Sequence, residues 1–226
     1  MLSSIGFFHL PQTSPKILTN NYAIEVLLNE NAIKGQIEIE GAYLIEQSPN
    51  DYNAKYANKV LYKLDDKEIT YEEMQEKVNC LGTALIQMGL KDKKIAIISE
   101  NRYEWEVAFF AISCGTGVVV PLDKTLNKKE IATIIKRANI EAVFCSKKYE
   151  DIITEVQKEV KELKYIISFE GSNSTSYNKL IEEGKKLINK KNNQFIDCKI
   201  DNEQVGFIVF TSGTTEKSKA VMLSHK

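Results

Sequence analysis

The stretch KIAIISENRYEWEVAFFAISCGTGVVVPLD, residues 94–123, decides the fold because it holds a strand, a helix and a second strand in succession. Its opening run KIAIIS is short and apolar, which is typical of a strand buried on both faces. Asn101 and Glu104 are spaced to cap a helix that continues through Ile112. Two glycines then end the helix before VVVPLD begins the next strand.

The residues before this stretch predict a hairpin and a long helix. VLYKL and EIT are strand-forming runs joined by the acidic turn DDK. Thr70 and Glu73 have the spacing of a capping box, in which each side chain satisfies a free backbone N–H at the start of a helix. Gly89 is placed to end this helix. Its apolar positions recur at helical spacing: Met74, Val78, Leu81, Leu85 and Met88.

The residues after the stretch continue the alternation. Asn127 and Glu130 are spaced to cap a second amphipathic helix, and IEAVFC is the next strand. An apolar stripe from Tyr149 to Leu163 predicts a further helix, followed by YIISF, a helix around Leu180, and the strands VGFIVF and AVMLSH. Helices between strands at this spacing predict the α/β class, with a largely parallel sheet flanked by helices. The aromatic and aliphatic stripes are expected to form its core.

Composition excludes several classes of function. Lys plus Arg is 30 and Asp plus Glu is 31, so the net charge of -1 argues against a nucleic-acid-binding protein. With two histidines and four widely spaced cysteines, neither a histidine-based metal site nor a disulfide framework is expected. The N-terminal MLSSIGFFHLPQ lacks a basic region, and no apolar run is long enough to span a membrane. We therefore expect a cytoplasmic protein whose residues 1–51 form a poorly defined segment.

The chemistry of the chain is concentrated in TSGTTEKSKA, residues 211–220. One interpretation of such a run is a simple solvated turn. The run can also bind phosphate, through backbone N–H groups, hydroxyl donors and a lysine charge. Walker A, the common phosphate loop, fits poorly, because Ser218 replaces its second glycine and Ala220 its final hydroxyl residue. A P-loop NTPase or kinase also requires a helix directly after Lys219, so a strand there would exclude that hypothesis.

The sequence resembles the adenylate-forming superfamily, which contains the AMP-binding acyl-CoA synthetases. TSGTTEKSKAVMLSH is similar to the family's phosphate-loop signature, and SENRYEWEVAFFAISCGTGVVVPLD is similar to an upstream family segment. The stretch that begins EITYEEMQEKVNC also has the family's character. The resemblance covers residues 52–226, which it identifies as the N-terminal portion of an AMP-binding domain. Three departures stand in the loop, where Glu216 and Ala220 replace glycines and Ser218 replaces a proline.

The resemblance implies the ATP-dependent activation of a carboxylic acid. Members form an acyl-adenylate in the presence of Mg²⁺, and the synthetases then transfer the acyl group to coenzyme A. By this resemblance, Thr211 is the candidate metal ligand and Lys219 offsets the charge of the leaving group. The phosphates would be held by the residues that match the signature: Thr211, Ser212, Gly213, Thr214, Thr215 and Lys219. His225 also matches but has no assigned role, and Lys217 is expected to be a solvated charge.

The family's other functional segments lie downstream of the phosphate loop and do not occur before Lys226. We therefore expect an N-terminal fragment that cannot complete adenylation alone. The segment from Asn101 onward favours a fatty acid as the substrate. The sequence assigns no catalytic residue to the reaction of this substrate. The alternatives are a non-catalytic remnant with weak phosphate binding and an amino-acid adenylation domain. The strand AVMLSH is further expected to leave an apolar sheet edge that promotes aggregation.

Overall fold

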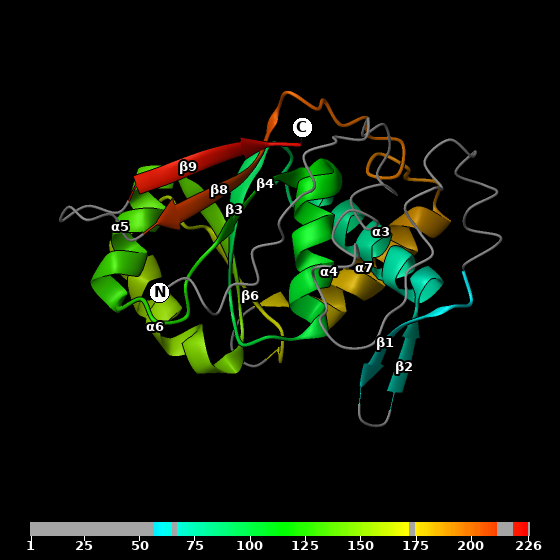
Figure 1. The fold of residues 1–226 in the computed structure, drawn as a ribbon, viewed down its shortest axis with the longest axis horizontal. Helices are drawn as coiled ribbons and strands as arrows, with labels where there is room; N and C mark the ends of the chain where they lie inside the picture. The colour runs from blue at the N-terminus through cyan, green and yellow to red at the C-terminus, as the bar shows by residue number, and fades with distance from the viewer. Residues whose placement is uncertain (1–56, 65–66, 172–174, 212–218, 226) are drawn as a thin grey trace.

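A seven-stranded sheet with helices on both faces forms the body of the molecule (Figure 1). The structure is a computed structural model and describes residues 57–64, 67–171, 175–211 and 219–225. The strands are β3 (Lys93–Ile98), β4 (Gly117–Pro121), β5 (Ile140–Cys145), β6 (Tyr165–Ser168), β7 (Thr175–Ser176), β8 (Val205–Thr211) and β9 (Lys219–Ser224), in the order β7-β6-β5-β3-β4-β8-β9. The described neighbours are parallel except β8 and β9, which are antiparallel. The predicted α/β class and largely parallel sheet are therefore confirmed.

The helices divide into two layers, one on each face of the sheet (Figure 1). One layer consists of α3 (Tyr71–Gln87), α4 (Tyr103–Ala111) and α7 (Tyr177–Asn189), and the other of α5 (Lys128–Ala138) and α6 (Lys147–Glu159). Alternate residues of each central strand pack against the two layers. In β3, Ile95 and Ile97 belong to the first hydrophobic core, whereas Ala96 and Ile98 belong to the second. Because both faces are covered, the last four residues of β3, Ile95 to Ile98, are apolar and buried, as the run KIAIIS predicted.

The predicted hairpin is β1 (Val60–Leu64) with β2 (Lys67–Thr70), an antiparallel pair beside the main sheet. It leads directly into α3, whose start carries the predicted capping box between Thr70 and Glu73. Of the five apolar positions expected along this helix, Met74, Val78, Leu81 and Leu85 are confirmed as buried core, whereas Met88 is the C-cap residue and only partly buried.

Two of the expected helix boundaries are wrong. Helix α4 begins at Tyr103 with Arg102 as its N-cap, so Asn101 does not cap it. The Glu104 carboxylate instead accepts a hydrogen bond from Arg102 Nε at 2.9 Å. Helix α6 ends at Glu159, because Val160 adopts an extended conformation. The apolar stripe nevertheless stays buried beyond that end, which explains why periodicity alone extended the helix.

A short π-helical turn, Ile112–Thr116, joins α4 to β4. Gly115 within it has φ +153°, a conformation that side-chain-bearing residues rarely adopt. At Gly117, an added Cβ would lie 2.1 Å from the Lys93 carbonyl oxygen, so the close approach of β4 to β3 requires glycine. The two glycines that ended the predicted helix therefore shape the turn into β4.

Several expectations concern residues outside the described part of the chain. These include the N-terminal segment 1–51, the first two residues of the DDK turn, part of the GSNSTS segment and residues 212–218. Within the described residues, no helix combines the length and apolar character needed to cross a membrane.

Candidate phosphate-binding site

Strands β8 and β9 position both ends of the candidate phosphate-binding segment. Strand β8 runs parallel to β4, with Val119 paired to Phe207, and ends at Thr211. Strand β9 begins at Lys219 and returns antiparallel, so that Lys219 is the direct register partner of Thr211. The fold therefore places a hydroxyl-bearing residue and an ammonium-bearing residue opposite each other, although seven residues separate them in the sequence.

The described structure includes two of the predicted phosphate-binding residues. Thr211 is partly buried at the end of its strand, and Lys219 is exposed. The remaining candidates lie outside the described residues: Ser212, Gly213, Thr214 and Thr215. Glu216, Lys217 and Ser218 lie outside them as well. A hydroxyl and an ammonium group are suitable partners for a metal-bound triphosphate, so the described donors fit the implied ligand.

The residues after Lys219 exclude Walker A geometry. Ala220 to Ser224 belong to strand β9 and pair with β8 from Phe210 back to Val205. A Walker A loop instead opens the helix that follows it. The hypothesis of a P-loop NTPase or kinase is therefore wrong for this chain.

The site lies at the carboxyl edge of the parallel strands, where α/β sheets bind ligands. Asp123 follows β4 at this edge, four residues beyond Val119, just as Thr211 stands four residues beyond its partner Phe207. The Asp123 carboxylate accepts hydrogen bonds from the backbone N–H and the hydroxyl of Thr125, at 2.8 and 2.7 Å. These bonds hold the pKa of Asp123 below its usual value. The sequence interpretation did not single out Asp123, although a carboxylate directly after a buried strand is a recognisable signal.

A second polar cluster stands farther along the same edge, at the ends of β5 and β6. Glu170 accepts a hydrogen bond from the Lys147 backbone N–H at 2.7 Å, at the start of α6, and forms an ion pair with Arg102. The Arg102 guanidinium lies 5.0 Å from the centre of the Phe169 ring and also pairs with Glu104. Because these charges are paired with one another, the cluster fixes the edge of the sheet rather than offering a free anion site.

His225, which matches the family pattern, is a packing residue in this structure. Its ring centre lies 5.4 Å from that of Phe207, and a Cβ added at Gly206 would lie 2.5 Å from His225 Nε2. Burial lowers the pKa of His225. Phe207 stacks in turn on Phe109, and Phe109 on Trp105, so this aromatic row joins β8 to α4. The row packs against the core, although its members are only partly buried.

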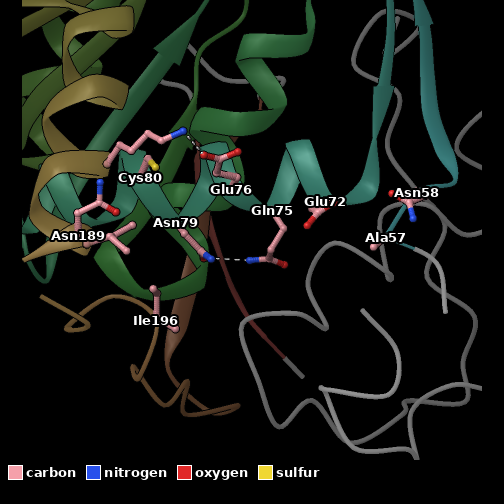
Figure 2. Close-up of a pocket in the computed structure, with 11 residues that line it drawn as sticks. Ala57, Asn58, Glu72, Gln75, Glu76, Asn79, Cys80, Asn189 and Ile196 are labelled. Carbon is pink, nitrogen blue, oxygen red and sulfur yellow. Dashed lines mark hydrogen bonds and ion pairs between the residues drawn. The ribbon is translucent and has the colours of Figure 1, made fainter. Parts of the chain in front are cut away.

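A polar cavity of about 660 Å³ lies between α3 and α7, away from this site (Figure 2). Glu76 and Lys185 form a 2.7 Å ion pair across it, and Gln75 donates to Asn79 at 2.9 Å. None of the residues that line it comes from β8 or β9, so it is separate from the candidate phosphate site. The part of the chain that the structure describes holds no group of three metal-ligating side chains.

The comparisons with known proteins agree with this geometry. The sequence model of the family described as AMP-binding enzyme matches residues 50–226. The chain belongs to the AMP-binding enzyme family. This assignment confirms the resemblance to adenylate-forming acyl-CoA ligases that the sequence indicated.

Relatives of this AMP-binding chain include fatty-acid ligases. "Fatty acyl-CoA synthetase B" of Dictyostelium discoideum is 32% identical over 168 residues, which cover 70% of this chain and 25% of the relative. "Long-chain-fatty-acid-CoA ligase 1" of Cavia porcellus is 30% identical over 175 residues, covering 70% and 24%. The chain thus spans about a quarter of the length of the curated relatives it matches.

Solved structures of CoA ligases share the fold. The anthranilate CoA ligase AuaEII superposes with a TM-score of 0.66 at 19% identity, covering 77% of this chain and 32% of that one. The long-chain-fatty-acid-CoA ligase FadD1 from Archaeoglobus fulgidus gives 0.64 at 16% identity, covering 78% and 35%. At these identities the likeness shows the architecture alone.

Proposed function

We propose that this chain supplies the ATP phosphate-binding part of an enzyme that activates a carboxylic acid, specifically a fatty acid, to an acyl-adenylate and then to acyl-CoA. The observation that carries the proposal is the pairing of Thr211 with Lys219 at the carboxyl edge of the sheet, with a strand following the lysine. The printed names of the relatives support the fatty acid and coenzyme A as substrates. ATP and Mg²⁺ follow from membership of the family.

In this proposal the segment 211–219 holds the β- and γ-phosphates, with Ser212, Gly213, Thr214 and Thr215 among its donors. The carboxylate of the substrate attacks the α-phosphorus, and pyrophosphate leaves. Attack of one anion on another requires neutralisation of charge, so the contribution of this segment is positioning and electrostatics. Thr211 would hold Mg²⁺ through its hydroxyl, and Lys219 would balance the charge of the departing phosphates.

The domain division belongs to the same proposal. Residues 52–226 form the N-terminal portion of an AMP-binding domain, and residues 1–51 form a separate segment. We place the protein in the cytoplasm. The alternative of a non-catalytic remnant differs in two respects, since it predicts weak phosphate binding and no acid-dependent chemistry.

The test is binding of Mg²⁺–ATP by calorimetry. Lys219→Met removes the paired ammonium while keeping most of the side-chain length, and it should weaken binding at least about tenfold. Lys217→Met is the matched control. It removes an equal charge two residues before Lys219, at a position to which the resemblance assigns no contact with the phosphates. Equal effects of the two variants would show that only overall charge attracts the nucleotide.

The catalytic part of the proposal has its own readout. Thr211→Val removes the hydroxyl at nearly constant shape, and we expect it to weaken Mg²⁺-dependent binding of ATP more than Thr211→Ser does. In a protein that carries the complete AMP-binding domain, pyrophosphate exchange dependent on added fatty acid should occur in the wild type and fall in Lys219→Met. If ATP binds only weakly and no carboxylate supports exchange, the remnant is the correct description.

A further inference from the structure

Lys91 and Cys198 meet at a single backbone carbonyl, although 107 positions separate them in the sequence. The Lys91 Nζ atom lies 3.3 Å from Cys198 Sγ and donates a hydrogen bond to the Gly115 carbonyl oxygen at 2.6 Å. The Cys198 thiol points to the same oxygen, at 3.7 Å. An amine and a thiol are thus held side by side by a shared acceptor.

The surrounding elements hold this contact in place. Lys91 lies in the short turn between α3 and β3, and Gly115 lies in the π-helical turn before β4. Cys198 belongs to the connection between α7 and β8, and its backbone N–H bonds to the Phe195 carbonyl at 3.2 Å. Phe195 is fully buried, and an added Cβ at Gly82 would lie 2.2 Å from its ring. The connection is therefore anchored three residues before the thiol.

The other cysteines lack this combination of access and partner. Burial raises the pKa of Cys114 and Cys145 to about 12 and that of Cys80 to about 11. Such thiols stay protonated and unreactive at neutral pH. Cys198 is only partly buried, so peroxide can reach its sulfur, and the Lys91 amine lies 3.3 Å from that sulfur.

We propose that Lys91 and Cys198 form a reversible covalent cross-link under oxidation by hydrogen peroxide, in which one oxygen atom joins the lysine nitrogen to the cysteine sulfur. The separation of the two atoms favours an oxygen bridge, because a direct nitrogen–sulfur bond would require them to move much closer together. The cross-link would tie the turn before β3 to the connection that leads into β8, the strand that ends at Thr211.

The chemistry balances with two molecules of peroxide. First, the Cys198 sulfur attacks one peroxide oxygen, so that an S–O bond forms and the O–O bond breaks. The products are a sulfenic acid at Cys198 and one molecule of water. Lys91 then loses its extra proton to solvent. A second peroxide accepts two electrons and two hydrogens, one from the sulfenic O–H and one from the amine. The N–O bond forms, and two waters leave.

Mass spectrometry tests the proposal directly. The protein is treated with hydrogen peroxide and digested with a protease that does not cleave at lysine. A linked pair of peptides containing Lys91 and Cys198 should appear, heavier than their sum by one oxygen and lighter by two hydrogens. It should disappear after treatment with a thiol reductant. In Lys91→Arg, Cys198 should still oxidise, but no linked pair should form.

Lys199→Arg is the matched control, because Lys199 contacts the thiol through its backbone carbonyl. This variant should cross-link as the wild type does. The link closes a large loop, so the oxidised wild type should unfold at a higher temperature than oxidised Lys91→Arg. A disulfide between Cys114 and Cys198, a direct nitrogen–sulfur link, or oxidation of Cys198 without any link would each overturn the proposal.

Discussion

At the residue scale, Glu106 is a carboxyl group on α4 that the fold partly buries. Burial raises its pKa from 4.5 to about 7, and the Tyr62 hydroxyl of the β1–β2 hairpin donates a hydrogen bond to it. The unfolded chain releases this proton near pH 4.5 and the folded protein near pH 7. Between these values the folded state binds more protons, so the free energy of unfolding falls as pH rises. We expect Glu106 to cost on the order of 2–3 kcal/mol above pH 7 compared with its effect near pH 4.5.

Glu106→Gln isolates this effect because it keeps the shape and removes the titration. In urea unfolding at pH 5 and pH 8, the variant should gain stability relative to the wild type as pH rises. Tyr62→Phe is the companion variant, since it removes the donor and leaves the carboxyl buried, so the fall in stability with pH should persist. A constant difference between Glu106→Gln and the wild type across this range would show that Glu106 titrates in the same way in both states.

At the element scale, three helix starts with similar sequences behave differently. Thr70 with Glu73 and Asn127 with Glu130 form complete capping boxes, whereas Asn101 with Glu104 does not. Asn127→Ala should therefore lower the free energy of unfolding by about 1 kcal/mol. Asn101→Ala is the matched control and should change it much less, because α4 has no side-chain cap. Equal losses in chemical unfolding followed by circular dichroism would contradict the structural assignment.

The same comparison shows what sequence can and cannot predict. Capping spacing and apolar periodicity are local, so they identified α3, α5 and the buried face of α6. The predicted cap at Asn101 fails for a tertiary reason. The Arg102 guanidinium forms ion pairs with both Glu104 and Glu170, so the Glu104 carboxylate binds Arg102 instead of completing a capping box. For the site, the order of strand, segment and strand could be predicted from residues 205–224 alone. The Thr211–Lys219 register could not, because it depends on how β8 and β9 pair, and the meeting of Lys91 with Cys198 could not, because it joins segments 107 positions apart.

At the scale of the whole molecule, β9 leaves an apolar edge on the sheet, as its sequence indicated. Val221, Met222 and Leu223 are exposed by 42%, 67% and 43%, and the strand pairs with β8 on one side. An exposed apolar edge strand offers unpaired backbone groups and hydrophobic side chains to another chain. We expect concentration-dependent association of the 226-residue chain, measurable by light scattering.

Met222→Lys should reduce that association, because a charge on an edge strand opposes the docking of a second strand. The side chain is mostly exposed, so its replacement should change thermal stability little. Ile196→Lys provides the control, since Ile196 is exposed by 39% in a connection outside the sheet. It makes the same change from apolar to charged without touching the edge and should leave association unchanged. If Met222→Lys instead lowered the unfolding temperature by several degrees, the side chain would be covered by other residues of the protein, and the edge would not be free to associate.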